Sequence, residues 1–271
     1  SGGEPLSYPD FDKMIENIGP ERFWIATDTN GWLLEKKAKH LKEIGVDKVQ
    51  ISLDSFNKDE HDTFRKQKGS YDRIMKGIDA VKAVGLDLLL MTCVTRQRVY
   101  SDEFIQFLEF AKKSEVRVYV TLAKPIGAWA GNMDVVCGDE DIRHLDTLKE
   151  KYGILTRFYS DNSVDLGCIA VKRSITITKY GDVMPCPYIQ TSLGNIFDED
   201  LGDILDRGLA LRHFSHGTNR TCISGNRDHE FVKKYMPKIW TSKEPVPYNK
   251  VFDKNDFISE KAAKKWLRPE T

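Results

Sequence analysis

The fold is decided by the stretch Lys48-Val49-Gln50-Ile51-Ser52-Leu53-Asp54-Ser55, a short aliphatic run that ends on polar residues. Its apolar and β-branched side chains predict a buried strand. Helical patterns, Leu34–Ile44 and Tyr71–Val84, lie on either side of it. A strand between two helices is the repeating unit of a parallel βα sheet.

The same alternation of helical and strand patterns continues from Pro9 to Ser160. It predicts an α/β fold, a partial parallel βα barrel of the TIM type with helices outside a parallel sheet. The expected helices are Phe11–Ile18, Leu34–Ile44, Tyr71–Val84, Glu103–Lys113 and Glu140–Tyr152, and the expected strands are Phe23–Thr27, Lys48–Leu53, Leu86–Val94, Val116–Leu122 and Ile154–Tyr159.

A second, smaller unit is expected after residue 160, where the pattern changes. Arg173–Thr178 and Val183–Ile189 predict two strands, and Tyr180-Gly181-Asp182 between them predicts a hairpin turn. Helices are expected at Asp200–Phe214 and Asp228–Tyr235. Residues 236–271 carry four prolines and predict an extended tail. The expected domains are therefore 1–160, 161–235 and a tail from 236 to 271.

Charge and cysteine content narrow the class of protein. Lys+Arg of 41 against Asp+Glu of 41 gives a formal net charge of zero, so neither nucleic acid nor a membrane surface is an expected partner. The longest apolar run, Leu86–Val94, is far shorter than the roughly 20 residues that span a bilayer. Three of the five cysteines lie between positions 168 and 222, which favours metal ligation in a reducing compartment and predicts a cytoplasmic protein.

Polar residues that follow the expected strands are the candidates for function, since strand ends and their loops meet on one face of a parallel sheet. They fall in Asp28–Gly31, Asp54–Phe56, Thr95–Gln97 and Ala123–Gly131. At the start of the chain, Gly2-Gly3-Glu4-Pro5 adds two glycines that let the backbone approach a ligand and a carboxylate that can hold an amine. A plain turn into the first helix is the alternative for this segment.

In their order along the chain, these segments resemble the radical S-adenosylmethionine (radical SAM) enzymes. Gly2-Gly3-Glu4-Pro5 resembles that family's glycine-glycine-glutamate-proline motif, whose backbone and Glu hold the methionine amino group of the cofactor. Thr29-Asn30-Gly31 resembles the close of the family's third strand, and Val49–Ser55 resembles its fourth. The loop from Lys124 to Asn132 resembles the family's glycine-containing loop near the adenine.

The resemblance implies a binding wall for S-adenosylmethionine. Ser52 and Asp54 would face the cofactor's ribose and carboxylate, and Arg65 in the segment after the fourth strand would bind a carboxylate as a planar donor. The alternatives are that Ser52 and Asp54 only cap the next helix and that Arg65 is a solvated surface charge. The implied binding residues are Gly2, Gly3, Glu4, Pro5, Asn30, Ser52, Asp54 and Arg65.

The family's defining motif, three cysteines at spacings of three and two residues that bind a four-iron cluster, does not occur among the five cysteines here. In the family it lies upstream of the glycine-glycine-glutamate-proline segment. We therefore expect a radical SAM fragment that lacks its first βα unit and does not cleave S-adenosylmethionine by itself. In an intact relative, a cluster reduced by a donor such as flavodoxin or ferredoxin cleaves the cofactor, and the resulting radical removes a hydrogen atom from the substrate.

Three later cysteines, Cys168, Cys186 and Cys222, predict a second metal site. A cysteine before a hairpin, one after its turn and a third beyond a helix can converge on one iron–sulfur cluster, which thiolates ligate. Gly181–Tyr188 followed by Leu193–Ile196 resembles the auxiliary-cluster region called SPASM or, when halved, twitch. This resemblance implies a small α+β domain with an auxiliary cluster. Free thiols and a zinc site are the alternatives.

The fourth ligand of such a cluster is not evident. A complete site usually supplies another cysteine near the third, but that neighbourhood is Cys222-Ile223-Ser224-Gly225. Asp228, His229, substrate or water could take the position, or no cluster forms. Relatives with both domains modify peptides or proteins, or dehydrogenate small alcohols, and peptide or protein maturation is the preferred expectation. The alternatives are a catalytically inactive barrel that binds a ligand and a zinc-stabilised barrel enzyme.

Overall fold

The computed structural model describes residues 3–156, 168–215 and 221–267. The chain divides into two compact units. We call the first, Gly2–Thr121 with His144–Leu155, the barrel unit. The second, Leu122–Arg143 with Thr156–Thr271, is the C-terminal unit. The segment 122–143 therefore groups with residues that follow it much later in the sequence.

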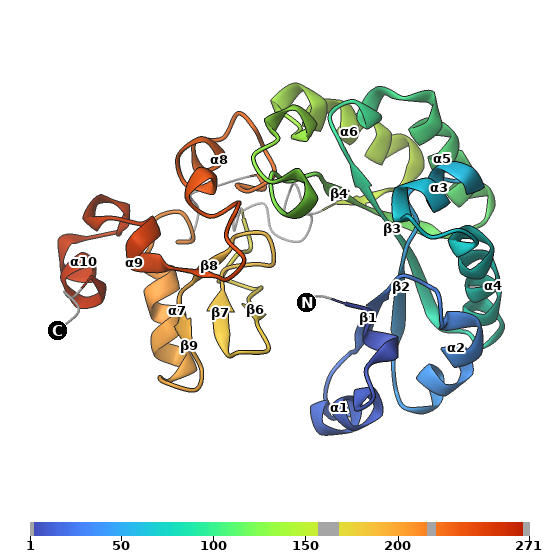
Figure 1. Ribbon diagram of the computed structural model, residues 1–271, viewed down its shortest axis with the longest axis horizontal. Coiled ribbons are helices and arrows are strands. Elements are labelled where there is room, and N and C mark those ends of the chain that lie inside the picture. Colours follow the sequence, from blue (N-terminus) through green and yellow to red (C-terminus); the bar gives the residue numbers. More distant parts are fainter. Residues whose placement is uncertain (1–2, 157–167, 216–220, 268–271) are drawn as a thin grey trace. The chain divides into compact units, whose positions relative to one another are not determined.

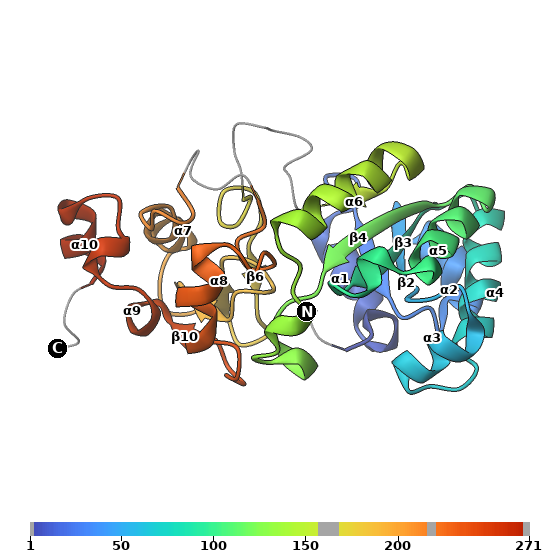
Figure 2. The same cartoon turned by 90° about the horizontal axis from the view of Figure 1, so that it is seen from above.

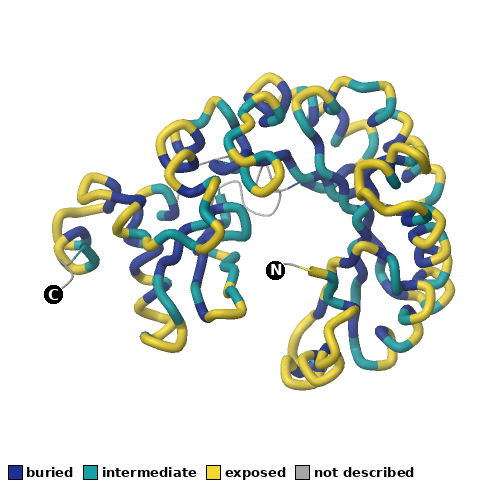
Figure 3. Tube along the Cα trace, in the orientation of Figure 1, coloured by how far each residue is buried: buried dark blue, intermediate teal, exposed yellow. Residues whose placement is uncertain are grey.

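One five-stranded sheet, in the order β1-β2-β3-β4-β5, organises the first half of the chain. Its first three strands pair in parallel, with Thr29 opposite Ile51 and Ile51 opposite Leu90. Much of the chain along these strands is buried, as Figure 3 shows. The predicted α/β fold with a parallel sheet is confirmed. The strands are β1 (Ala26–Thr29), β2 (Lys48–Ser52), β3 (Asp87–Val94), β4 (Arg117–Leu122) and β5 (Leu155–Thr156).

Amphipathic helices cover the outer side of this sheet (Figure 1), and the view from above shows α2, α4 and α5 on that same side (Figure 2). On α4, Ile74, Ile78 and Val81 recur at helical spacing and are buried, while the opposite face is polar. α2 packs against α4. The helices are α1 (Phe11–Ile18), α2 (Leu34–Glu43), α3 (Lys58–Arg65), α4 (Ser70–Ala83), α5 (Asp102–Lys113) and α6 (Asp139–Tyr152), with short 3₁₀ turns at Pro5–Ser7, Arg98–Tyr100, Gly127–Trp129 and Met133–Val135.

Gly31 fixes the loop that leaves β1. Its φ of +79° lies in the left-handed region, and a Cβ at this position would come within 2.7 Å of Cγ1 of Ile74. Only a residue without a side chain lets the loop pass this close to α4. The end of β1 is thereby held against the helix layer.

Two elements of the barrel unit differ from expectation. β1 begins at Ala26 rather than Phe23, and the aromatic side chains of Phe23 and Trp24 are 54% and 64% exposed. Helix α3 was not predicted because its sequence is almost wholly polar, with His61 as its buried residue. It forms because the Asn57 side chain accepts hydrogen bonds from the first backbone N–H groups of the helix. The expected strand end at residues 157–159 lies outside the described residues.

Short strands form the sheets of the C-terminal unit. The predicted hairpin is confirmed, since β6 and β7 pair antiparallel with Ile177 opposite Val183. β7 also pairs with β9, while β8 pairs in parallel with β10, near the end of the chain. The strands are β6 (Thr176–Ile177), β7 (Asp182–Met184), β8 (Thr191–Ser192), β9 (Gly194–Asn195) and β10 (Val246–Pro247), and the helices are α7 (Leu201–Leu209), α8 (Glu230–Lys234), α9 (Tyr248–Val251) and α10 (Glu260–Trp266), with 3₁₀ turns at Met236–Lys238 and Lys254–Asp256.

The expectation of an extended tail after residue 235 is wrong. The tail folds into turns and short helices whose apolar side chains, including those of Phe252 and Phe257, are buried in the core of the C-terminal unit. The Tyr235 hydroxyl donates to the buried carboxylate of Asp256. α7 ends at Leu209 rather than near residue 214 because the backbone beyond it pairs with the tail, where Ile258 N donates to the carbonyl of Ala210 at 2.9 Å.

Candidate functional site

Glu4 ties the opening segment of the chain to the end of β1. Its Oε1 accepts hydrogen bonds from Thr29 Oγ1 at 2.6 Å and from Leu6 N at 3.2 Å, and its Oε2 accepts from Asn30 N at 2.7 Å. Gly3 before it has a φ of +82°. A carboxylate has about four acceptor sites, so Glu4 can still accept a hydrogen bond from an amine. The expected site residue Gly2 lies outside the described residues.

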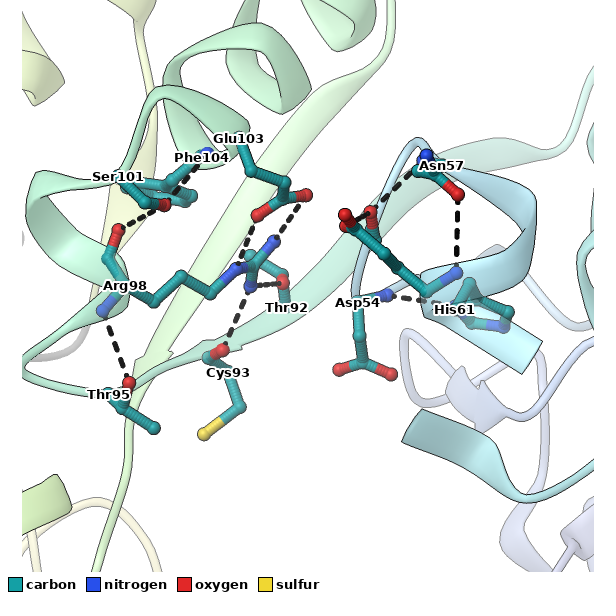
Figure 4. Close-up of polar contacts among 12 residues, drawn as sticks. Asp54, Asn57, His61, Thr92, Cys93, Thr95, Arg98, Ser101, Glu103 and Phe104 are labelled. Atoms are coloured by element: carbon teal, nitrogen blue, oxygen red, sulfur yellow. Dashed lines mark hydrogen bonds and ion pairs between the residues drawn. The ribbon is translucent and has the colours of Figure 1, made fainter. Parts of the chain in front are cut away.

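A second polar group lies at the end of β2. Asp54 is buried, and its Oδ2 accepts from Nε of Arg65 at 2.5 Å. The backbone N of Asp54 donates to Nδ1 of His61 at 3.2 Å, and Nε2 of His61 lies 3.4 Å from Oγ of Ser70. Burial lowers the pKa of His61, so its ring is neutral at neutral pH and Nδ1 can act as the acceptor. Figure 4 shows Asp54 beside His61 at the start of α3.

The structure thus groups the predicted binding residues by strand. Glu4, Pro5 and Asn30 belong to the group at β1, and Ser52, Asp54 and Arg65 to the group at β2. Because β1 and β2 are adjacent and parallel, both groups lie at the same edge of the sheet. Arg65 uses Nε toward Asp54 and carries four further N–H donors, which suit a carboxylate ligand.

Sequence reasoning missed Arg98, which follows β3. Its guanidinium donates to Oε2 of Glu103 at 3.0 Å, to Oγ1 of Thr92 at 2.5 Å and to the carbonyl of Cys93 at 2.9 Å. Figure 4 shows the guanidinium between these partners. It also lies over the ring of Phe104. The available signal was an arginine just after the strand-end segment Thr95–Gln97, five residues before a glutamate at a helix start.

The three predicted thiol ligands all belong to the C-terminal unit. Burial raises the pKa of Cys186 to about 12, and the charges of Cys168 and Cys222 act in the same direction. Burial likewise raises the pKa of Cys168, again with a contribution from Cys222. Each of the first two sulfurs is therefore within electrostatic reach of both others. Backbone N–H groups of Ala170 and Ile223 point to Cys168, and those of Tyr188 and Ile189 to Cys186.

These residues fit an iron–sulfur cluster by their chemistry. Thiolates are the ligands of such clusters, and N–H groups aimed at sulfur are among the protein's means of tuning them. The described ranges contain no group of three or more His, Cys, Asp or Glu side chains that could hold a single metal ion.

The residues considered for the fourth position have other partners. Oδ2 of Asp228 accepts from the backbone N of Asp139 at 2.8 Å, at the start of α6. Nδ1 of His229 accepts from the backbone N of Phe231 at 3.0 Å and so caps α8. Ser224 is closer to the thiols, with its Oγ 3.6 Å from Sγ of Cys222.

Two lysines accompany the thiols. Burial lowers the pKa of Lys172, and the charge of Cys168 opposes that shift. Lys124 is buried with 6% of its surface exposed, and its Nζ lies 4.0 Å from the centre of the Tyr188 ring. No helix in the part of the chain described here is both long enough and apolar enough to cross a membrane.

Two family models match the chain. The model described as the radical SAM superfamily matches residues 1–120, which include every residue of the predicted binding wall. The SPASM model, described as an iron–sulfur cluster-binding domain, matches residues 168–226. That second match begins at Cys168 and includes Cys186 and Cys222.

Several known relatives are GTP cyclases by name. A probable GTP 3′,8-cyclase of Methanocella arvoryzae is 34% identical over 144 residues, which are 53% of this chain and 47% of that protein. The GTP 3′,8-cyclase of Helicobacter pylori strain 26695 is 29% identical over 214 residues, 71% of this chain and 65% of that protein. The chain thus spans between about half and two thirds of their length.

Solved structures share the fold at low identity. Streptococcus suis SuiB has a TM-score of 0.64 at 19% identity, over 89% of this chain and 65% of that one. Native anSMEcpe with bound AdoMet and Cp18Cys peptide has a TM-score of 0.56 at 17% identity, over 76% of this chain and 65% of that one. The likeness covers both units of the chain.

Proposed function

Since this chain belongs to the radical SAM superfamily and carries a SPASM domain, we propose that it serves an enzyme that oxidises its substrate by hydrogen abstraction, with an auxiliary iron–sulfur cluster on Cys168, Cys186 and Cys222. The two domains imply S-adenosylmethionine and four-iron clusters as cofactors. S-adenosylmethionine, when bound with a reduced cluster, supplies the radical that removes the hydrogen atom. The observation that carries the proposal is that three cysteines inside the SPASM match lie within electrostatic reach of one another, since the charges of Cys168 and Cys222 both raise the pKa of Cys186.

The barrel unit's part in this proposal is to bind the cofactor. Glu4 accepts a hydrogen bond from the amino group of the cofactor, in a position fixed by Thr29 and Asn30. Arg65, oriented by Asp54, binds a carboxylate through its remaining N–H donors. Ser52 at the end of β2 offers a hydroxyl to the ribose. These groups bind and orient the cofactor without exchanging protons with it.

The C-terminal unit's part is to hold the auxiliary cluster and the substrate. Cys168, Cys186 and Cys222 would hold three irons of a four-iron cluster. Asp228 and His229 are engaged elsewhere, so the proposal leaves the fourth iron to substrate or water. A substrate with a lone-pair donor could bind there, and the cluster would supply an electron acceptor next to it.

A peptide or protein is our first substrate class, by likeness to relatives with the same pair of domains. The second candidate is a purine nucleoside triphosphate, favoured by the sequence relatives named as GTP 3′,8-cyclases. The two differ in what can reach the fourth iron: a peptide offers a side chain or an amide, and the nucleotide offers ring nitrogens. Both predict that the bound substrate changes the electronic spectrum of the cluster.

Anaerobic reconstitution of the chain with iron and sulfide tests the proposal. We expect the wild type to take up about four irons and four sulfides and to turn brown, and each of the Cys168→Ser, Cys186→Ser and Cys222→Ser variants to lose this uptake. Cys93→Ser is the matched control, because Cys93 is a half-buried thiol of the barrel unit and its loss leaves uptake unchanged.

Adding substrates to the reduced, loaded chain then separates the two classes. Electron paramagnetic resonance signals that shift with GTP and not with peptides favour the nucleotide. Colourless protein that retains one zinc per chain through the same three cysteines contradicts the iron–sulfur proposal. Equal iron uptake by the serine variants and the wild type also contradicts it.

A further inference from the structure

Lys124 is a buried cation of the C-terminal unit that the proposed function does not use. It directly follows Leu122–Ala123 at the end of β4 and is 6% exposed. Its Nζ donates to the carbonyl of Leu122 at 2.7 Å. Buried lysines are rare unless a negative or polar partner compensates the charge. Lys124 therefore places a cationic side chain inside the C-terminal unit.

The neighbourhood of Lys124 is the thiol site. A Cβ placed on Gly225 would lie 3.3 Å from Nζ of Lys124 and 3.4 Å from Sγ of Cys222, so the ammonium and the sulfur are separated by no more than the sum of these distances. The lack of a side chain at Gly225 permits this approach. Nζ also lies 4.0 Å from the centre of the Tyr188 ring, and the backbone N–H of Tyr188 points to Cys186.

The lysine therefore lies near Cys222, and the ring that it contacts belongs to the residue whose backbone N–H points to Cys186. A four-iron cluster with three thiolates carries net negative charge, which increases by one when the cluster accepts an electron. A fixed positive charge nearby stabilises the reduced form more than the oxidised form, because the Coulomb attraction grows with the cluster's charge. Net charge around a cluster is one of the determinants of its reduction potential.

Building on the proposed function, we propose that the ammonium group of Lys124 raises the reduction potential of the auxiliary cluster held by Cys168, Cys186 and Cys222. Lys124 acts on the cluster through its charge and does not contact the substrate, so it is not a catalytic residue. Lys172, which is influenced by the charge of Cys168, is a second and more exposed source of positive charge.

Reductive titration of the loaded chain followed by electron paramagnetic resonance tests this role. None of the cysteines in this sequence has the three-and-two spacing, so the signal reports the auxiliary cluster alone. We expect Lys124→Met to shift the midpoint potential to a more negative value at unchanged iron content. Lys124→Arg keeps the charge and is expected to stay close to the wild-type potential.

Lys179→Met is the matched control. Lys179 also lies over a tyrosine ring, that of Tyr180 at 4.8 Å, but it is exposed and belongs to the β6–β7 turn. We expect its substitution to leave the potential unchanged. A negative shift in K124M that K179M and K124R do not show supports the proposal.

The remaining outcomes also decide the matter. A loaded K124M with the wild-type potential overturns the proposal. Failure of both K124M and K124R to take up iron shows a structural role instead and overturns it as well, whereas failure of K124M alone with a normal K124R supports a requirement for the charge. Failure of the wild type to bind any cluster contradicts the proposed function itself, and iron analysis distinguishes this result from the others.

Discussion

The strand ends of the barrel unit and the thiol group of the C-terminal unit differ in how the chain compensates buried polar atoms. At the strand ends, Asp54 has Arg65, Glu103 has Arg98, and Glu4 has Thr29 and Asn30. At the thiols, burial outweighs the backbone N–H groups, and the pKa of Cys186 rises to about 12. The first region is completed by its own side chains, whereas Cys168 and Cys186 in the second have raised pKa values that a bound cationic centre would lower.

The largest expected effect follows from this difference. Loading with iron and sulfide should slow amide hydrogen exchange around Cys186 and Cys222 far more than in β1 and β2, because a group that binds only the folded state stabilises the unit that holds it. Free cofactor at 100 times its dissociation constant corresponds to about 2.7 kcal/mol. Mass spectrometry of the exchanged peptides measures the change in protection on loading. Equal protection in the two units would show that the thiol site does not depend on the cluster more than the strand ends do.

A smaller effect is expected from breaking a pair within the barrel unit. Arg98→Met should lower the free energy of unfolding of that unit by about 2 to 3 kcal/mol, since it leaves the mostly buried carboxylate of Glu103 without its cation. Arg117→Met removes the matched but more exposed pair with Asp87 and should cost less than about 1 kcal/mol. Urea unfolding, followed by exchange of peptides from β3 and α5, measures both. Similar losses in the two variants would mean that burial does not distinguish the pairs.

The smallest effect concerns acid. Burial lowers the pKa of His213 below the ordinary 6.5, although Asp256 acts against this. The unfolded chain therefore binds a proton more readily, and the stability contributed by the neutral ring is present above pH 6.5 and lost as the pH falls below it. His213→Gln should flatten this loss in the C-terminal unit, and His40→Gln in the barrel unit should not. Exchange rates from pH 7.5 to 5 test it, and an unchanged slope in H213Q would contradict it.

The parallel sheet was predictable because its strands are short runs of buried aliphatic residues. In β2 the buried Val49 and Ile51 alternate with partly exposed residues and are followed by polar ones, and the amphipathic pattern of α4 is regular. Helix α3 was not predictable from periodicity, because it is stabilised by a cap at Asn57 rather than by an apolar face. The folded tail was hidden by its prolines, which argue locally for extended chain while the buried Phe252 and Phe257 act through distant contacts.

The candidate site divides in the same way. Residues within short motifs, such as Glu4, Asp54 and Cys186, could be identified because the chemistry is carried by the residue type and its spacing. Arg98 and Lys124 could not, because their significance depends on which distant atoms they meet. A lysine after a strand carries no sequence signal of burial, and its proximity to Cys222 is created by a glycine about a hundred residues later.

The pairing of the tail with the segment after α7 has a consequence for where this module ends. The SPASM match stops at residue 226, yet the Leu211 backbone pairs with Phe257, and Asp256 closes over Tyr235. The physical building block is thus some forty residues longer than the stretch by which it is recognised. The recognised stretch does not include Phe252 and Phe257, which belong to the same core as the residues around Cys168 and Cys186. A relative can therefore share the cysteines without sharing the aromatic residues that complete this core.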